Sequence, residues 1–264
     1  MINFEYKKSL GQNFLKDKTI IDKIVNAPTI REDNLVIEIG PGSGALSKEL
    51  VKKFDNVLLY EIDRRLEDTL QNELKDFNNY ELIFGDFLER NVLDDIEKYN
   101  FKHLYIVANL PYYVTTPIIM KIINDNIFAE EIVIMIQKEV ADRFSSIPGS
   151  REYGQISVIL QYYFEISKVC NVSKNCFVPR PRVDSSVIKL KRRDNLLPIK
   201  DYSFFEKLVR DSFRFKRKTI KNNLNDYDLD KVNKVLSKYG FDINSRSENL
   251  SYEIFIDIAN ELSN

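Results

Sequence analysis

The chain has 264 residues and a mass of 31.0 kDa, enough for one large domain or for a medium domain with a small one. Lysine and arginine number 39 against 40 acidic residues, so a nucleic-acid surface has to come from local clusters and not from net charge. The chain shows no signal peptide and no apolar run near the roughly 20 residues of a membrane helix. Cys170 and Cys176 are too few for a disulfide framework or a zinc site. We expect a soluble cytoplasmic monomer without metal or membrane association.

The first half of the chain alternates predicted strands and helices. Asp17 is placed to cap a helix over residues 18–26. The predicted strands cover residues 35–39, 57–60, 80–84, 104–108 and 132–136. The predicted helices between and after them include residues 64–75, the segment 117–123 that Pro117 opens, and a helix through Val140 and Phe144. This alternation predicts a mostly parallel sheet with helices on both faces.

The second half changes character. Residues 156–164 and 186–190 are interpreted as two more strands, and a final hairpin is plausible. Beyond residue 194 the pattern predicts helices over about residues 204–224, 229–239 and 252–262. We therefore expect two domains, an α/β domain over residues 1–194 and a small all-helical domain over residues 195–264.

A glycine-rich turn follows the first predicted strand. Three of the 8 glycines, Gly40, Gly42 and Gly44, lie in this one turn, where they let the backbone approach a ligand closely. Glu61 follows about twenty residues later, at the end of the second strand, where an acid can bind ribose hydroxyls. Nicotinamide dinucleotides and S-adenosylmethionine both carry an adenosine ribose, so these two motifs do not separate them.

Polar residues end the next two strands as well. Asp86 follows the third strand, next to the position expected for the adenine of a bound adenosine. Asn109 ends the fourth strand and opens Asn109-Leu110-Pro111-Tyr112. The Asn109 oxygen and a nearby carbonyl can each accept an N–H bond of an exocyclic adenine amine, while Pro111 fixes the turn and Tyr112 offers a stacking face. The pattern favours a pocket for a base that is to be alkylated.

Together these motifs resemble the ribosomal RNA adenine dimethyltransferases over nearly the whole chain. The matching segments are Lys8-Ser9-Leu10-Gly11-Gln12-Asn13-Phe14-Leu15, Glu38-Ile39-Gly40-Pro41-Gly42-Ser43-Gly44, Asn109-Leu110-Pro111-Tyr112, and Phe177-Val178-Pro179-Arg180-Pro181-Arg182-Val183-Asp184-Ser185. The resemblance implies a class I, Rossmann-like methyltransferase fold with a seven-stranded sheet that uses S-adenosylmethionine and releases S-adenosylhomocysteine. It implies a catalytic role for residues 109–112 and stacking of the target adenine by Tyr112 and Phe177. It implies donor contacts at Asn13, Leu15, Gly40, Gly42, Glu61, Asp86 and Asn109.

Two branches share these motifs. One (the KsgA type) dimethylates two adjacent adenines in the 3′-terminal hairpin of small-subunit rRNA within an immature 30S-type subunit, and the other (the Erm type) methylates large-subunit rRNA and confers antibiotic resistance. The intact N-terminal signature, residues 213–224 and residues 247–251 favour the first. Arg180 and Arg182 stand where that branch usually has Pro and Lys. A mainly non-catalytic assembly factor and a nucleotide-dependent oxidoreductase remain alternatives.

The predicted C-terminal helices also carry a basic cluster. Arg210, Arg214, Arg217, Lys218 and Lys221 recur at helical spacing, and we expect them to form one stripe that contacts rRNA phosphates.

Overall fold

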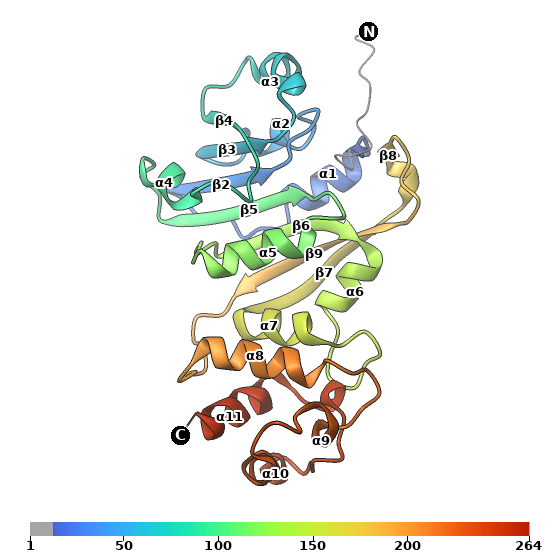
Figure 1. Ribbon diagram of the computed structural model, residues 1–264. Helices are drawn as coiled ribbons and strands as arrows, with labels where there is room; N and C mark the ends of the chain where they lie inside the picture. The colour runs from blue at the N-terminus through green and yellow to red at the C-terminus, as the bar shows by residue number, and fades with distance from the viewer. Residues whose placement is uncertain (1–12, 264) are drawn as a thin grey trace. The chain divides into compact units, whose positions relative to one another are not determined.

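The computed structural model describes residues 13–263, which fold into two compact units (Figure 1). The first unit contains the chain up to Ala141 and residues 167–191, and the second contains residues 142–166 and the chain from Arg192 onward. The division near Arg192 lies close to the expected one. The sequence placed residues 142–166 in the first domain, whereas they cluster with the second unit, because the helix within them packs on the C-terminal helices. Among the described residues no helix has the length and apolar character that a membrane crossing requires.

The first unit is built on a seven-stranded sheet with the order β4-β3-β2-β5-β6-β9-β7. Its strands are β2 (Asn34–Ile39), β3 (Asn56–Glu61), β4 (Tyr80–Phe84), β5 (His103–Asn109), β6 (Glu131–Gln137), β7 (Phe164–Val172) and β9 (Ser185–Arg192). The pairs from β4 to β6 are parallel and β9 is antiparallel to β6. The strand order reverses between β2 and β5, and the crevice at such a point is where open α/β sheets bind ligands. The predicted fold class is confirmed.

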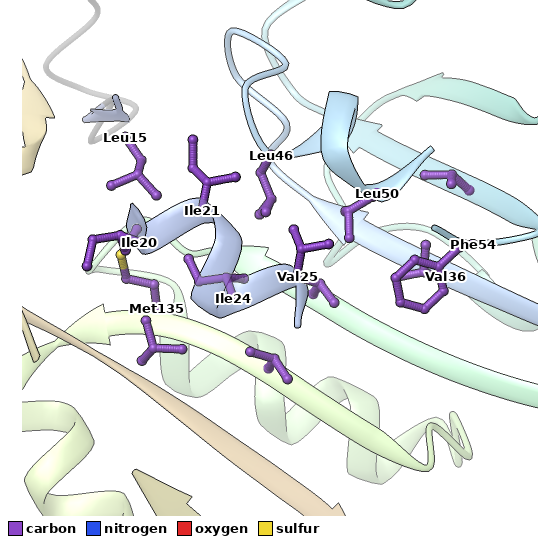
Figure 2. Packing of buried hydrophobic residues seen from close by; sticks show 14 of the residues in the cluster. Leu15, Ile20, Ile21, Ile24, Val25, Val36, Leu46, Leu50, Phe54 and Met135 are labelled. Atoms are coloured by element: carbon purple, nitrogen blue, oxygen red, sulfur yellow. The ribbon is translucent and has the colours of Figure 1, made fainter. Parts of the chain in front are cut away.

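Helices cover both faces of this sheet. The helical segments of the first unit are α1 (Lys18–Val25), α2 (Ser47–Leu50), the 3-10 turn η2 (Arg64–Leu66), α3 (Glu67–Leu74), α4 (Val92–Glu97), α5 (Thr115–Asn124), the start of α6 (Lys138–Phe144) and the 3-10 turn η3 (Lys174–Cys176). Asp17 caps α1 as predicted, accepting from the backbone N–H of Thr19 at 2.9 Å and of Ile20 at 3.3 Å. Figure 2 shows the apolar side chains of α1 between Leu46 and Leu50 on one side and Met135 of β6 on the other.

The opposite face is closed by the segment that leads into α4. The hydroxyl of Tyr60 on β3 donates to Asp95 of α4 at 3.0 Å, and the Tyr60 ring packs edge-on against Phe87 with centroids 5.2 Å apart. Both rings are buried. The central strands are thus apolar on both faces, which explains why their sequence shows continuous apolar runs.

A second, two-stranded sheet joins distant parts of the first unit. β1 (Phe14–Leu15) pairs antiparallel with β8 (Phe177–Val178), which places Leu15 opposite Phe177. The backbone N–H of Lys16 adds a bond to the Cys176 carbonyl at 2.9 Å. This pairing fixes Asn13 and Phe14 beside the main sheet, although residues 8–12 of the N-terminal signature and the basic pair Lys7 and Lys8 lie outside the described residues.

The second unit is helical. It contains the end of α6, α7 (Gln155–Tyr163), α8 (Tyr202–Ser212), α9 (Ile220–Asn223), α10 (Leu229–Lys238), the 3-10 turn η4 (Ser247–Asn249) and α11 (Tyr252–Leu262). α11 packs against α7, α8 and α10, and buried Phe205, Leu208 and Phe255 belong to the interior of this unit.

The prediction of a strand over residues 156–164 is wrong, because residues 155–163 form α7 and the strand begins only at Phe164. An apolar run of this length is ambiguous between a buried helix and a buried strand. The Ser157 side chain favours the helix over the strand. Its Oγ accepts from the Gly154 N–H at 3.1 Å and donates to the Arg143 carbonyl at 2.8 Å. Such a bond from the third helical residue back to the N-cap stabilises a helix start.

The single helix expected over residues 204–224 is also wrong. α8 ends at Ser212 and α9 starts at Ile220, with a turn between them. The buried Asn223 side chain holds this break, donating from Nδ2 to the Ser212 carbonyl at 2.7 Å and accepting at Oδ1 from the Phe215 N–H at 3.0 Å. These bonds satisfy backbone groups that a continuous helix would pair internally.

Candidate functional site

One cavity opens at the carboxyl ends of β2, β3 and β5, where the strand order reverses. It is lined by Asn13, Phe14, Leu15, Glu38, Gly40, Pro41, Gly42, Ser43, Ala45, Leu46, Glu61, Ile62, Leu66, Asn109, Leu110, Pro111 and Tyr112. All four residues of the motif 109–112 and six of the seven predicted donor contacts are in this set, with Asn109 counted in both. Asp86 and Phe177 are not. Residues far apart in the sequence therefore meet in one place.

The glycine turn supplies backbone at the floor of this cavity. Gly40 and Gly42 have φ values of +74° and +58°, a region that L side chains rarely adopt. A Cβ atom on Gly42 would lie 2.6 Å from Cε1 of Phe14, whereas a Cβ on Gly40 would meet no atom within 4 Å. A side chain at Gly42 would thus be strained by its φ and would need the Phe14 ring to shift, and the open side of Gly40 leaves room for a ligand.

Glu61 at the end of β3 holds the turn in place. Its Oε2 accepts from the Gly42 N–H at 3.0 Å and its Oε1 from the Asp63 N–H at 2.9 Å. Burial raises the pKa of this carboxyl, while the two backbone N–H groups lower it. A carboxylate bound on two sides by backbone is fixed in one orientation.

Glu38 near the end of β2 is the second buried carboxyl of the cavity. It is 1% exposed, and among residues 13–263 its Oε2 has no hydrogen-bond partner. Burial raises the pKa of Glu38 to about 8, the nearby Ser47 hydroxyl lowers it, and the charge of Glu61 raises it. A buried polar atom without a partner costs free energy, so this oxygen is a ready acceptor for a cationic or hydrogen-bonding ligand group.

Asn109 ends β5 with its side-chain amide already oriented. Nδ2 donates to the backbone carbonyl of Asn13 at 3.1 Å. A carbonyl only accepts, so the bond determines which end of the amide carries the oxygen. Within the described part of the chain no donor reaches Asn109 Oδ1 or the Leu110 carbonyl, and the Leu110 N–H is bound to the Met135 carbonyl at 3.1 Å. Two hydrogen-bond acceptors, Asn109 Oδ1 and the Leu110 carbonyl oxygen, thus lie at the end of β5.

Tyr112 lies in the turn before α5. Its hydroxyl is 3.0 Å from Oγ of Ser185, a residue that is 1% exposed at the start of β9. Burial raises the pKa of this phenol above its ordinary value. The bond fixes the far end of the ring, and the ring itself lines the cavity.

Two predicted site residues are placed differently. Asp86 is half-buried after β4, and its Oδ1 accepts from the Leu88 N–H at 2.9 Å, a local turn bond. Phe177 is 3% exposed and belongs to the hydrophobic cluster that includes α1. Its pairing with Leu15 explains the burial. Adenine contact by Asp86 and stacking by Phe177 stay predictions.

The predicted basic stripe does not exist as one helical face, because the chain turns between α8 and α9. Arg210 lies on α8, Lys221 on α9, and Arg214, Arg217 and Lys218 in the turn between them. All five side chains are exposed. The charge cluster is therefore present on the surface of the second unit, with a different geometry from the one expected.

Comparison with known proteins decides the family. The sequence model described as "Ribosomal RNA adenine dimethylase" matches residues 3–264. The chain belongs to this family. A "Ribosomal RNA small subunit methyltransferase A" of Bacillus pumilus is 45% identical over 269 residues, covering 98% of this chain and 92% of the relative. It follows that the chain is a methyltransferase.

Solved structures of the family share the fold. A dimethyladenosine transferase from Plasmodium falciparum superposes with a TM-score of 0.77 at 26% identity, covering 93% of this chain and 95% of that one. The 23S rRNA methyltransferase ErmE gives a TM-score of 0.76 at 26% identity, covering 96% of this chain and 100% of that one. The fold alone therefore does not separate the two branches of the family.

Membership of a methyltransferase family implies S-adenosylmethionine as donor, and the cavity fits that molecule. The donor carries ribose hydroxyls and an ammonium group, whose O–H and N–H bonds suit the acceptor oxygens of Glu38 and Glu61. Its flat adenine suits the apolar side chains of Ile62, which is 49% exposed, and Leu66. The open side of Gly40 leaves space for its backbone to approach.

Several residues that line this cavity were not among the predicted site residues, and Glu38, Ile62, Phe14 and Leu66 are four of them. Glu38 is a charged residue inside an otherwise apolar strand, and that irregularity is a usable signal for a site residue. Ile62 is an apolar residue that follows a strand and remains exposed, which only the structure reveals. Phe14 lies within the N-terminal signature but was assigned no role there, and Leu66 carries no local signal.

Proposed function

We propose that this chain transfers methyl groups from S-adenosylmethionine to the N6 amines of adenines in small-subunit rRNA. The observation that carries the proposal is the orientation of Asn109: its amide N–H is bound to Asn13, so Oδ1 is left for the target amine. The name shared by relatives above 40% identity supports the small subunit as the source of the substrate.

The residues at the end of β5 account for the chemistry. The sulfonium methyl of the donor supplies an activated electrophile. Asn109 Oδ1 and the Leu110 carbonyl each accept one N–H of the adenine amine, which draws the nitrogen lone pair out of conjugation with the ring and aims it across the cavity. Positioning then provides most of the rate, because the donor needs no further activation. The proton leaves after methyl transfer, when the nitrogen is acidic, so no strong base is required.

Tyr112 holds the base during this step. An adenine that enters the cavity has left its stack, and an aromatic face replaces part of the lost stacking. The Ser185 bond keeps the Tyr112 ring in one place through both transfers to the same nitrogen. Pro111 contributes by fixing the turn, and its carbonyl accepts from the Val114 N–H at 3.2 Å.

The finer assignment follows the small-subunit branch. We propose two adjacent adenines of the 3′-terminal hairpin loop as substrates, within an immature 30S-type subunit during ribosome biogenesis, for a monomeric cytoplasmic enzyme. Arg210, Arg214, Arg217, Lys218 and Lys221 are exposed and suited to contact phosphates of that RNA. Phe177 and Asp86 are assigned to the target base and to the adenine of the donor.

The test is to map dimethyladenosine after incubation with labelled donor. Purified immature small subunits and large-subunit rRNA are each treated with the wild-type chain and with Asn109→Ala. We expect label at two neighbouring adenines of small-subunit rRNA with the wild type, and labelling slower by about 10²- to 10³-fold with the variant. Label confined to the large subunit would refute the branch assignment. Calorimetric binding of NAD in place of S-adenosylmethionine would refute methyl transfer.

A further inference from the structure

The turn between α8 and α9 presents an aromatic ring among positive charges. We name residues 214–218, Arg214-Phe215-Lys216-Arg217-Lys218, the basic turn. All five side chains are exposed, and Phe215 exposes 50% of its surface. Half of the Phe215 surface is therefore open to a ligand, in a segment whose other four residues are all cations.

The basic turn is held from behind by one buried amide. Asn223, 7% exposed, donates from Nδ2 to the carbonyls of Ser212 at 2.7 Å and Phe215 at 3.4 Å, and its Oδ1 accepts from the Phe215 N–H at 3.0 Å. Arg217 adopts a left-handed φ of +67°, which an ordinary extended loop avoids. The backbone that carries Phe215 is thus fixed, and little order has to be gained when a ligand contacts the ring.

The charges of the basic turn are not used inside the protein. Among residues 13–263 none of its four cations forms an ion pair, whereas other exposed lysines do, such as Lys234 with Glu261 at 2.7 Å. The Arg214 guanidinium lies 5.1 Å from the centre of the Phe215 ring. Unpaired cations attract phosphates, and a ring among them offers a stacking face to a base.

We infer that Phe215 is a base-stacking residue, whose ring takes an unpaired base of rRNA while the cations of the basic turn contact the flanking phosphates. The inference rests on the proposed function for its ligand. A single ring amid cations suits RNA better than an apolar protein partner, which would need a contiguous apolar patch.

Fluorescence tests the stacking directly. The chain contains no tryptophan, so Phe215→Trp introduces a single indole as reporter. The full-length variant is titrated at fixed salt with a short single-stranded adenosine-rich RNA, with a blunt duplex of the same length, and with linear polyphosphate. We expect strong quenching by the single strand, weak quenching by the duplex and none by polyphosphate. No quenching by RNA, or equal quenching by polyphosphate, overturns the inference.

Affinity measurements separate stacking from charge. Phe215→Leu should weaken single-stranded RNA binding by about 5- to 100-fold and leave the salt dependence unchanged. Lys218→Gln should reduce the slope of log K against log salt by about 0.7. Tyr239→Leu, which removes a 43% exposed ring of the same unit, is the matched control and should bind as the wild type. Phe215→Tyr keeps an aromatic ring and should bind RNA with the affinity of the wild type.

The outcomes distinguish this inference from the proposed function. If the wild type methylates small-subunit rRNA and Phe215→Leu binds RNA with unchanged affinity, only the role of Phe215 is wrong. If Phe215→Leu loses affinity for a small-subunit protein and keeps it for naked RNA, the ring binds protein and the inference is also wrong. If the wild type methylates no rRNA, the proposed function fails, and the quenching experiment still reports whether Phe215 stacks on RNA.

Discussion

The Asn109 side chain on β5 donates to the Asn13 carbonyl at 3.1 Å, across 96 residues of sequence. The bond fixes the orientation of the amide without help from substrate, and Asn109 lines the cavity. Asn109→Ala removes this acceptor, and Asn109→Asp replaces the N–H donor with an oxygen that repels the Asn13 carbonyl.

Both Asn109 variants should lose about 10²- to 10³-fold in kcat, the usual cost of removing a preorganised polar group at a reacting atom. Donor affinity should change by less than about threefold, because most of the proposed donor contacts lie on other elements. Single-turnover methyl transfer and calorimetric titration measure the two quantities. An active Asn109→Ala enzyme would sink the assignment.

Tyr112 is predicted to act through its ring more than through its hydroxyl. Tyr112→Phe keeps the stacking face but removes the hydroxyl that bonds to Ser185 and positions the ring. We therefore expect it to lose about 1 kcal/mol of transition-state stabilisation, measured as a lower kcat/KM. Tyr112→Leu also removes the face and should cost about 1–3 kcal/mol more. Ser185→Ala is the matched control and should resemble Tyr112→Phe. Equal effects of the Phe and Leu variants would argue against stacking.

Gly42 and Gly40 form a natural pair of tests in one turn. Both substitutions by Ala place a Cβ at positive φ, which costs about 1 kcal/mol each. Only Gly42→Ala also collides with Phe14, at 2.6 Å, so it should lower the Tm by several degrees more than Gly40→Ala. Thermal unfolding without donor measures the difference. The double variant Gly42→Ala, Phe14→Leu should recover part of the lost Tm. If it recovers none, contact with the Phe14 ring is not the cause of the destabilisation.

Glu38 should make stability depend on pH. Its pKa is about 8 in the folded chain against 4.5 as the ordinary value, so the folded state holds one more proton between these limits. The free energy of unfolding therefore falls as pH rises through this window, by at most about 1.4 kcal/mol per pH unit, and is flat outside it. The Glu38→Gln variant has no titrating group at this position, so its free energy of unfolding lacks this pH dependence.

The measurement is the Tm of wild type and Glu38→Gln at pH 5, 6, 7 and 8 without donor. The advantage of the variant should grow with pH, because the wild type has to protonate Glu38 on folding, whereas the carboxyl is ionised in the unfolded chain. Glu61 is retained in both proteins, and its raised pKa acts in the same direction in each. Parallel Tm curves would show that Glu38 is not buried as a neutral acid.

Much of the first unit could be predicted from residues alone. The strands that became β2 to β6 are apolar runs between turns, and such periodicity is local. The motif residues at strand ends also converge by rule, because parallel strands end at one edge of a sheet. The C-terminal helices α10 and α11 were predicted to within one residue because each has a regular apolar face.

The two wrong secondary-structure predictions have a common cause in side-chain bonds to the backbone, which apolar periodicity does not reveal. Residues 155–163 are apolar enough for either a strand or a helix, and bonds from Ser157 to Arg143 and Gly154 favour the helix. Asn223 breaks the expected helix by bonding to Ser212, eleven residues earlier.

The sequence by itself determined the family, the positions of the motif residues at the ends of the strands and the identity of the acceptor amide. Short motifs carry this information in adjacent residues. Only the tertiary structure decided how that amide is turned, which carboxyl is left without a partner and where the cations face. Each of these depends on a hydrogen bond or a burial created when separate segments pack together, and no local pattern encodes it.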